Sequence, residues 1–102
     1  MFALMVRFHC RDGAAVSGFD KLVAATVEKI REYEPGTLDY TVHRVDGKPL
    51  ERIFYELYRD RGAFDAHEAQ EYVKEFLEAR NEFITSFEVD FLDPVVGKRT
   101  LG

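Results

Sequence analysis

The apolar residues of this chain recur with two different periods, and the order of those periods restricts the fold. Alternation at every second position is typical of a strand and occurs in four segments: residues 2–9, 37–45, 51–58 and 85–92. Spacing of three and four is typical of a helix and occurs over residues 17–33 and 60–84, with an expected break near residues 68–70. Arg80 falls on the apolar stripe of the second helical segment. The predicted order is strand, helix, strand, strand, helix, strand.

Turn-forming residues separate these segments. Ser17 and Asp20 resemble the capping pair of a helix start. That helix should end before Pro35, because proline disfavours the helical conformation in the residue that precedes it. Asp46 and Gly47 predict a hairpin between the second and third strands. The whole pattern predicts an α+β fold of the ferredoxin-like βαββαβ type, a four-stranded antiparallel sheet with its helices on one face.

Helices on one face would leave the other face of the sheet open to water. Met5 and one of the two largely apolar sets of residues 51–58 would lie on that open face. A contiguous exposed apolar patch usually marks an interface. The sequence therefore predicts a homodimer whose two sheets pack face to face, with the tail over residues 95–102 as a candidate contact to the partner subunit.

Charge and composition exclude several classes of partner. The chain has 102 residues and a formal net charge of −5, without a run of Lys or Arg. An acidic chain of this kind is a poor binder of nucleic acid or of an anionic membrane surface. The apolar stretch from Phe2 to Phe8 is too short to span a bilayer and lacks the features of a signal peptide. Cys10 is the single cysteine, which fits a reducing compartment. We expect one cytoplasmic domain over residues 1–102.

Three segments of the chain resemble the antibiotic biosynthesis monooxygenase family. They are Pro-Gly-x-x-x-Tyr at residues 35–40, Tyr-Glu-x-Tyr at residues 55–58, and Ala-Phe-x-x-His at residues 63–67. The predicted order of strands and helices agrees with that family over nearly the whole chain. The resemblance implies a dimeric α+β barrel. Its members include quinol and polyketide oxygenases, haem-degrading enzymes and proteins without a demonstrated activity.

Oxygenation without a metal or flavin needs a substrate that itself supplies electrons, a proton acceptor, donors for the resulting anion, and a dry cavity. We assign His67 as the base, because an imidazole can accept a proton near neutral pH. Tyr58 and Tyr72 are predicted to orient the substrate. The side chains expected to line the substrate cavity are Phe8, Tyr40, Phe54, Glu56 and Phe64. The predicted reactants are a small aromatic phenol, quinol or polyketide-like molecule and O₂, with no cofactor and no metal.

Each site assignment has a purely structural alternative. His67 could pin its helix, and the aromatic side chains could belong to a solid core. Glu56 lies in an otherwise apolar strand, where a buried carboxylate is costly unless paired, so it could bind Arg7 or another base across the sheet. His9, Cys10 and His43 match no common zinc pattern.

Two alternative functions also follow from the sequence. One is a non-catalytic ligand-binding or dimerisation module of the same fold. The other is haem binding or degradation, with His67 as an axial ligand. The haem-degrading relatives are characterised by an Asn on the first strand and a Trp at the end of the third. Here the sole Asn is Asn81, no Trp is present, and Tyr58 stands at the Trp position. Many quinol-oxidising relatives carry a further His-Phe pair where this chain has Tyr72 and Val73.

Overall fold

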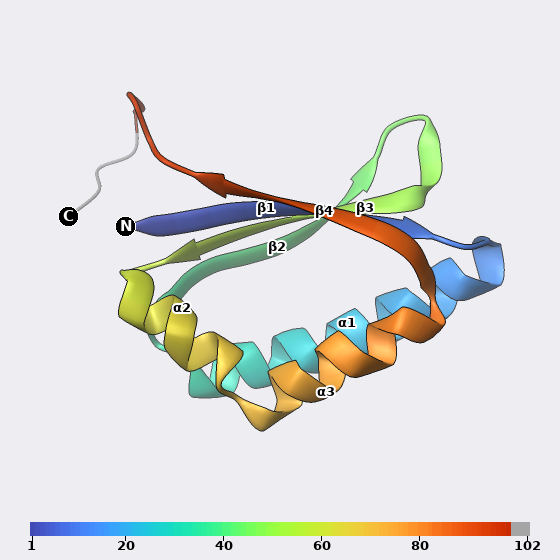
Figure 1. Ribbon diagram of the computed structural model, residues 1–102, viewed down its shortest axis with the longest axis horizontal. Helices are drawn as coiled ribbons and strands as arrows, with labels where there is room; N and C mark the ends of the chain where they lie inside the picture. The colour runs from blue at the N-terminus through green and yellow to red at the C-terminus, as the bar shows by residue number, and fades with distance from the viewer. Residues whose placement is uncertain (99–102) are drawn as a thin grey trace.

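The computed structural model describes residues 1–98, in which one four-stranded sheet carries all its helices on one side (Figure 1). The strands are β1 (Phe2–Cys10), β2 (Thr37–Val45), β3 (Lys48–Tyr58) and β4 (Ile84–Leu92). The helices are α1 (Gly13–Tyr33), α2 (Arg61–Glu68) and α3 (Glu71–Ala79), followed by the 3₁₀ turn η1 (Arg80–Glu82). The strands lie in the order β2-β3-β1-β4, and every neighbouring pair is antiparallel. The expected ferredoxin-like βαββαβ fold is confirmed.

The start of α1 differs from the prediction. The helix begins at Gly13 rather than at Ser17, and the Asp12 side chain accepts a hydrogen bond of 2.8 Å from the backbone N–H of Ala15. This bond satisfies one of the free donors of the first turn, which is the role that we had given to Ser17. The predicted capping pair is therefore wrong, because the turn residues before the helix already supply the cap.

Asp20, the second member of that predicted pair, anchors α1 to the sheet instead. The guanidinium of the buried Arg52 on β3 binds its carboxylate through two parallel hydrogen bonds of 2.9 and 3.0 Å. A two-bond pairing of this kind fixes orientation as well as distance. It holds the helix at a defined angle across the sheet.

The predicted break in the second helical region is confirmed. Asp60 caps the start of α2 by accepting a hydrogen bond of 2.7 Å from the N–H of Ala63. The helix ends at Glu68, and α3 begins at Glu71 after the extended residue Gln70. The chain changes direction between the two helices (Figure 1). His67 consequently lies in the last turn of α2.

Aromatic rings form the centre of the core between the sheet and the helices. The largest fully buried side chains are Tyr58, Phe8, Phe19 and Phe54. The ring of Phe8 lies 4.8 Å from that of Phe54 and 5.2 Å from that of Phe19, centroid to centroid. Burial of each such ring contributes about 1.5–3 kcal/mol to folding. The core thus connects β1, β3 and α1.

The β4 strand receives less cover from the helices. Its predicted inward residues lie on the helical side of the sheet, but Phe87, Val89 and Phe91 are 43, 40 and 62% exposed. β4 is an edge strand. The helical face of the sheet is therefore open along this edge.

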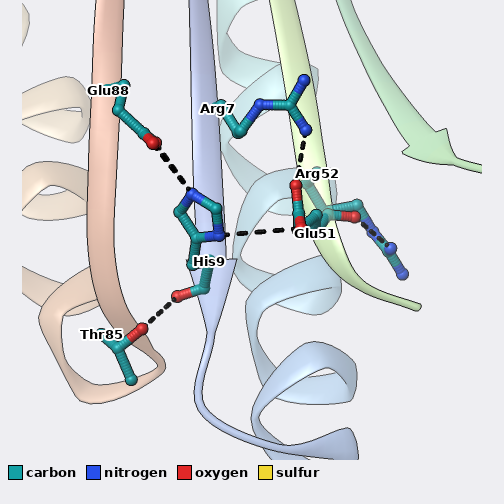
Figure 2. A network of polar contacts seen from close by, with 6 residues as sticks. All are labelled: Arg7, His9, Glu51, Arg52, Thr85 and Glu88. Carbon is teal, nitrogen blue, oxygen red and sulfur yellow. Dashed lines mark hydrogen bonds and ion pairs between the residues drawn. The ribbon is translucent and has the colours of Figure 1, made fainter. Parts of the chain in front are cut away.

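The face of the sheet without helices carries a row of charged residues over β3, β1 and β4. Figure 2 shows His9 between Glu88 and Glu51, with its Nε2 2.8 Å from a Glu88 oxygen and its Nδ1 3.8 Å from a Glu51 oxygen. Arg7 donates a hydrogen bond to Glu51, and this bond lowers the pKa of that carboxyl. Part of the open face is therefore polar and internally paired.

Another part of this open face is apolar, as expected. Met5 is partly exposed there, and a hollow of about 440 Å³ lies between the sheet and residues 92–97, lined in part by Ala3, Tyr55 and Leu57. Val95 and Val96 are 97 and 91% exposed. The predicted contact of the tail concerns residues 95–102, of which residues 99–102 lie outside the described part. Within residues 1–98, no helix has the length and apolar character needed to cross a bilayer.

Candidate functional site

A cavity of about 290 Å³ lies between the helical face of the sheet and helices α2 and α3. Six of the predicted site residues line it: Phe8, Tyr40, Phe54, Glu56, Phe64 and His67. Most of the remaining wall is aliphatic or aromatic, with Glu68 and Arg80 as the other charged side chains. The volume is close to the lower end of the range for small-molecule sites. A cavity is therefore present between the sheet and the helices, and the predicted lining residues border it.

The imidazole of His67 is held by a buried carboxylate at the end of α1. Its Nδ1 lies 2.8 Å from Oε1 of Glu34, and both side chains are 5% exposed. An ionised carboxylate can only accept hydrogen bonds, so the shared proton belongs to Nδ1 of His67. In the neutral ring this leaves Nε2 as the nitrogen with a free lone pair.

Glu34 itself is fixed by two further donors. The hydroxyl of Thr37 binds Oε1 at 2.7 Å, and the hydroxyl of Tyr72 binds Oε2. Burial favours the neutral carboxyl, but the hydrogen bonds from His67, Thr37 and Tyr72 together outweigh it and lower the pKa of Glu34. The carboxylate is ionised at neutral pH and holds the His67 ring in one tautomer.

The sequence analysis missed Glu34, which it used only as the end of a helix. One signal was present: a carboxylate at a helix C-terminus faces the negative end of the helix dipole. A carboxylate at this unfavourable position indicates that a partner elsewhere in the fold stabilises it. That partner, His67, is 33 positions away in the chain.

Tyr72 and Tyr58 lie behind the cavity wall rather than in it. Tyr72 donates to Glu34, and burial together with this bond raises the pKa of its hydroxyl. Tyr58 is fully buried and donates a hydrogen bond of 2.6 Å to Glu56. Neither tyrosine is among the residues that line the cavity. Both hydroxyls thus bind carboxylates: Tyr58 binds Glu56 of the cavity wall, and Tyr72 binds Glu34 behind His67.

Glu56 does not bind Arg7, and that expectation is wrong. The side chain of Glu56 lines the cavity on the helical face, whereas Arg7 lies on the opposite face and binds Glu51. The alternation of β1 and β3 separates them, because Glu56 is opposite Leu4 in the register and Arg7 is opposite Ile53. Burial raises the pKa of Glu56, with the bond from Tyr58 acting in the other direction.

The two carboxyls near His67 therefore have opposite environments. Glu34 is surrounded by donors that stabilise its anion, whereas Glu56 has one donor and an apolar wall. Environments that separate the pKa values of neighbouring acids are typical of sites that move protons. The aromatic rings of Tyr40 and Tyr58 pack 5.5 and 5.3 Å from the His67 ring and fix its plane.

The sequence model of the antibiotic biosynthesis monooxygenase family matches residues 1–79. The chain belongs to this family. The assignment confirms the resemblance that the three short motifs had indicated.

Solved structures of the family share the fold. An antibiotic biosynthesis monooxygenase crystal structure is 26% identical, with a TM-score of 0.84, covering 94% of this chain and all (100%) of that one. The protein Rv0793 of Mycobacterium tuberculosis is 25% identical, with a TM-score of 0.85, covering 96% of this chain and 98% of that one. A Pseudomonas aeruginosa protein at 21% identity has a TM-score of 0.82, with coverage of 93 and 94%. Comparison with curated proteins gives no significant match.

Metal ions and haem iron are commonly held in proteins by His and Cys side chains. In the part of the chain that the structure describes, no three His, Cys, Asp or Glu side chains are grouped as a metal site. His9 belongs to the paired charges of the open face (Figure 2), and Cys10 is buried in the core. His67 is the histidine that lines the cavity.

Proposed function

We propose that this chain is a cofactor-independent monooxygenase that oxidises an aromatic phenol or quinol in the cavity between the sheet and the helices. The observation that carries the proposal is the Glu34–His67 pair at the wall of an aromatic cavity. A carboxylate behind an imidazole is an arrangement that prepares the outer ring nitrogen to take a proton.

The first step is removal of the hydroxyl proton of the substrate by Nε2 of His67. The resulting phenolate is a strong electron donor, and the apolar wall from Phe8, Phe54 and Phe64 excludes water from it. Glu34 stabilises the imidazolium that forms, because its carboxylate faces the Nδ1–H. The protein supplies a base, an orientation and a dry space.

The overall reaction balances without an external reductant. A quinol loses two hydrogens and gains one oxygen atom, so that quinol and O₂ give hydroxyquinone and water. An anthrone-type CH₂ group and O₂ give the carbonyl and water by the same count. In each case one oxygen atom enters the product and the other leaves as water, with all four electrons drawn from the substrate. To Glu56, which lines the same cavity and whose pKa is raised by burial, we assign the return of a proton to the reduced oxygen.

Oxygen consumption tests this proposal. We expect the purified protein to consume O₂ faster than buffer with 1,4-dihydroxynaphthalene or anthrone, and to insert one labelled atom from ¹⁸O₂ into the product. Heat-denatured protein is the control. A trace equal to buffer with both compounds would contradict the proposal and would favour a ligand-binding module. A Soret shift on titration with hemin would instead favour the haem alternative.

We also propose that the chain is a homodimer formed through the open face of the sheet, and that it is cytoplasmic. The apolar part of that face and the exposed Val95 and Val96 support an interface. Sedimentation equilibrium at micromolar concentration is expected to give the mass of two chains. The mass of one chain at that concentration would contradict the dimer without affecting the proposed chemistry.

A further inference from the structure

Arg80 brings a positive charge to the far end of the cavity from His67. It is the first residue of η1, its side chain lines the cavity, and it is partly buried. The guanidinium carbon lies 4.4 Å from the ring centroid of Phe87 and 5.5 Å from that of Phe8. Contact with two ring faces orients the flat guanidinium group and leaves the N–H bonds in its plane available.

This guanidinium lacks a partner within residues 1–98. Its Nε is buried without a hydrogen bond, alone among the buried side-chain nitrogen and oxygen atoms of that range. No ion pair of those residues includes Arg80, although Glu68 also lines the cavity. Burial lowers the pKa of Arg80, as expected for a cation that has lost water.

Glu68 attracts this cation, but a partly buried guanidinium without a hydrogen-bonded partner is still costly for the fold. The other buried charged groups, such as Arg52 and Glu34, have their partners inside the chain. The cost at Arg80 is explained if a ligand supplies the missing anion. The fork of an arginine fits a carboxylate better than a single ammonium group would.

The strand register gives the distance between the two polar ends. Glu56 is opposite Leu4 on β1, whereas Phe87, below Arg80, is opposite Phe8. Phe8 follows Leu4 by four positions along β1, which corresponds to roughly 13 Å at about 3.3 Å per residue. Side chains that reach inward from both ends make the span open to a ligand shorter than this. The rings of Phe54 and Phe8 line the cavity between the Glu56 end and the Arg80 end.

We propose that Arg80 binds an acidic group of the substrate, and that the substrate is a fused-ring aromatic with its reacting hydroxyl near His67 and a carboxylate at the opposite end. This inference rests on the proposed function for the role of the hydroxyl. The recognition of the acidic end depends on Arg80 and the cavity alone.

Binding of matched naphthalene probes tests the inference without turnover. The probes are 6-hydroxy-2-naphthoate, with its two groups at opposite ends, 3-hydroxy-2-naphthoate, with adjacent groups, and 2-naphthol, which has no carboxylate. We expect calorimetry under nitrogen to show that the first binds at least about tenfold more tightly than either of the others. Equal affinities for the three probes, or no binding of any of them, would overturn the inference.

Variants assign the preference to Arg80. In Arg80→Gln the advantage of 6-hydroxy-2-naphthoate over 2-naphthol should disappear, while the affinity for 2-naphthol changes less than threefold. Arg80→Met, which replaces the guanidinium by an unbranched apolar side chain, should lose the advantage in the same way. The matched control is Arg61→Gln, since Arg61 also packs over a ring, that of Phe2, but lies outside the cavity lining. Persistence of the preference in Arg80→Gln, or its loss in Arg61→Gln, would overturn the role of Arg80.

The outcomes separate this inference from the proposed function. Preference for the opposed carboxylate without any oxygen uptake would leave Arg80 as an anion-binding residue and contradict the monooxygenase. Oxygen uptake with neutral quinols, but no preference for the opposed carboxylate, would support the monooxygenase and contradict the role of Arg80. Circular dichroism and a thermal melt of each variant show whether the fold is retained.

Discussion

Replacing His67 with glutamine is expected to slow oxygen uptake with quinols by about 10²–10⁴-fold while the chain remains folded. The glutamine amide can still donate a hydrogen bond to Glu34, so the buried carboxylate keeps a partner. It cannot accept a proton near neutral pH, so the phenolate does not form. The measurement is kcat in an oxygen electrode, with circular dichroism to verify folding.

Two further variants around the same carboxylate act as controls. Tyr72→Phe removes one of the hydrogen bonds to Glu34 and leaves His67 in place, so a loss of less than tenfold is expected. Glu34→Gln can donate to Nδ1 and so place the ring proton on Nε2, which should lower kcat and alter its pH profile. A His67→Gln variant with more than a tenth of the original rate would show that the imidazole is not the base.

Replacing Phe19 with alanine is expected to lower the free energy of unfolding by about 3–5 kcal/mol. The ring is fully buried and packs 5.2 Å from Phe8, 6.0 Å from Phe54 and 6.2 Å from Phe76, centroid to centroid. Its removal leaves a hollow among side chains of the sheet, α1 and α3, which the rigid core cannot close. Urea denaturation measures this change in the free energy of unfolding. All variants are compared at one protein concentration, because the stability of a dimer depends on concentration.

The matched control is Phe91→Ala, which removes an identical ring that is 62% exposed. Its expected cost is below about 1.5 kcal/mol, since little apolar area returns to water. Phe19→Leu keeps most of the volume and remains measurable if the alanine variant does not fold. A cost at Phe19→Ala no larger than at Phe91→Ala would contradict the description of the core.

The fold was predictable because it depends on periods that are local in the chain. Alternation in β1 placed Phe8 on the inner face, and the break before Glu71 was visible in the helical pattern. The start of α1 was not predicted correctly, because Asp12 and Ser17 are both acceptable caps by type. The structure decides between them through the position of the first turn.

The candidate site was predictable only in part. Periodicity places a side chain on a face, so it put Glu56 on the same face of its strand as Phe54, and Arg80 on the helical stripe. His67 was chosen from the family motif and from the chemistry of imidazole. It does not state which side chains from different elements meet. The bonds of Tyr72 and His67 to Glu34 therefore could not be anticipated from spacing.

The sequence alone determined the order of the elements, the inward aromatic residues and the family, since these follow from local pattern and short motifs. The tertiary structure alone decided that Glu34 holds His67, that Glu51 rather than Glu56 binds Arg7, and that Arg80 lacks a partner within residues 1–98. The physical reason is that the hydrogen bonds and the charge state of a buried polar group depend on its neighbours in space. Those neighbours are set by how the helices cross the sheet, which no single stretch of sequence records.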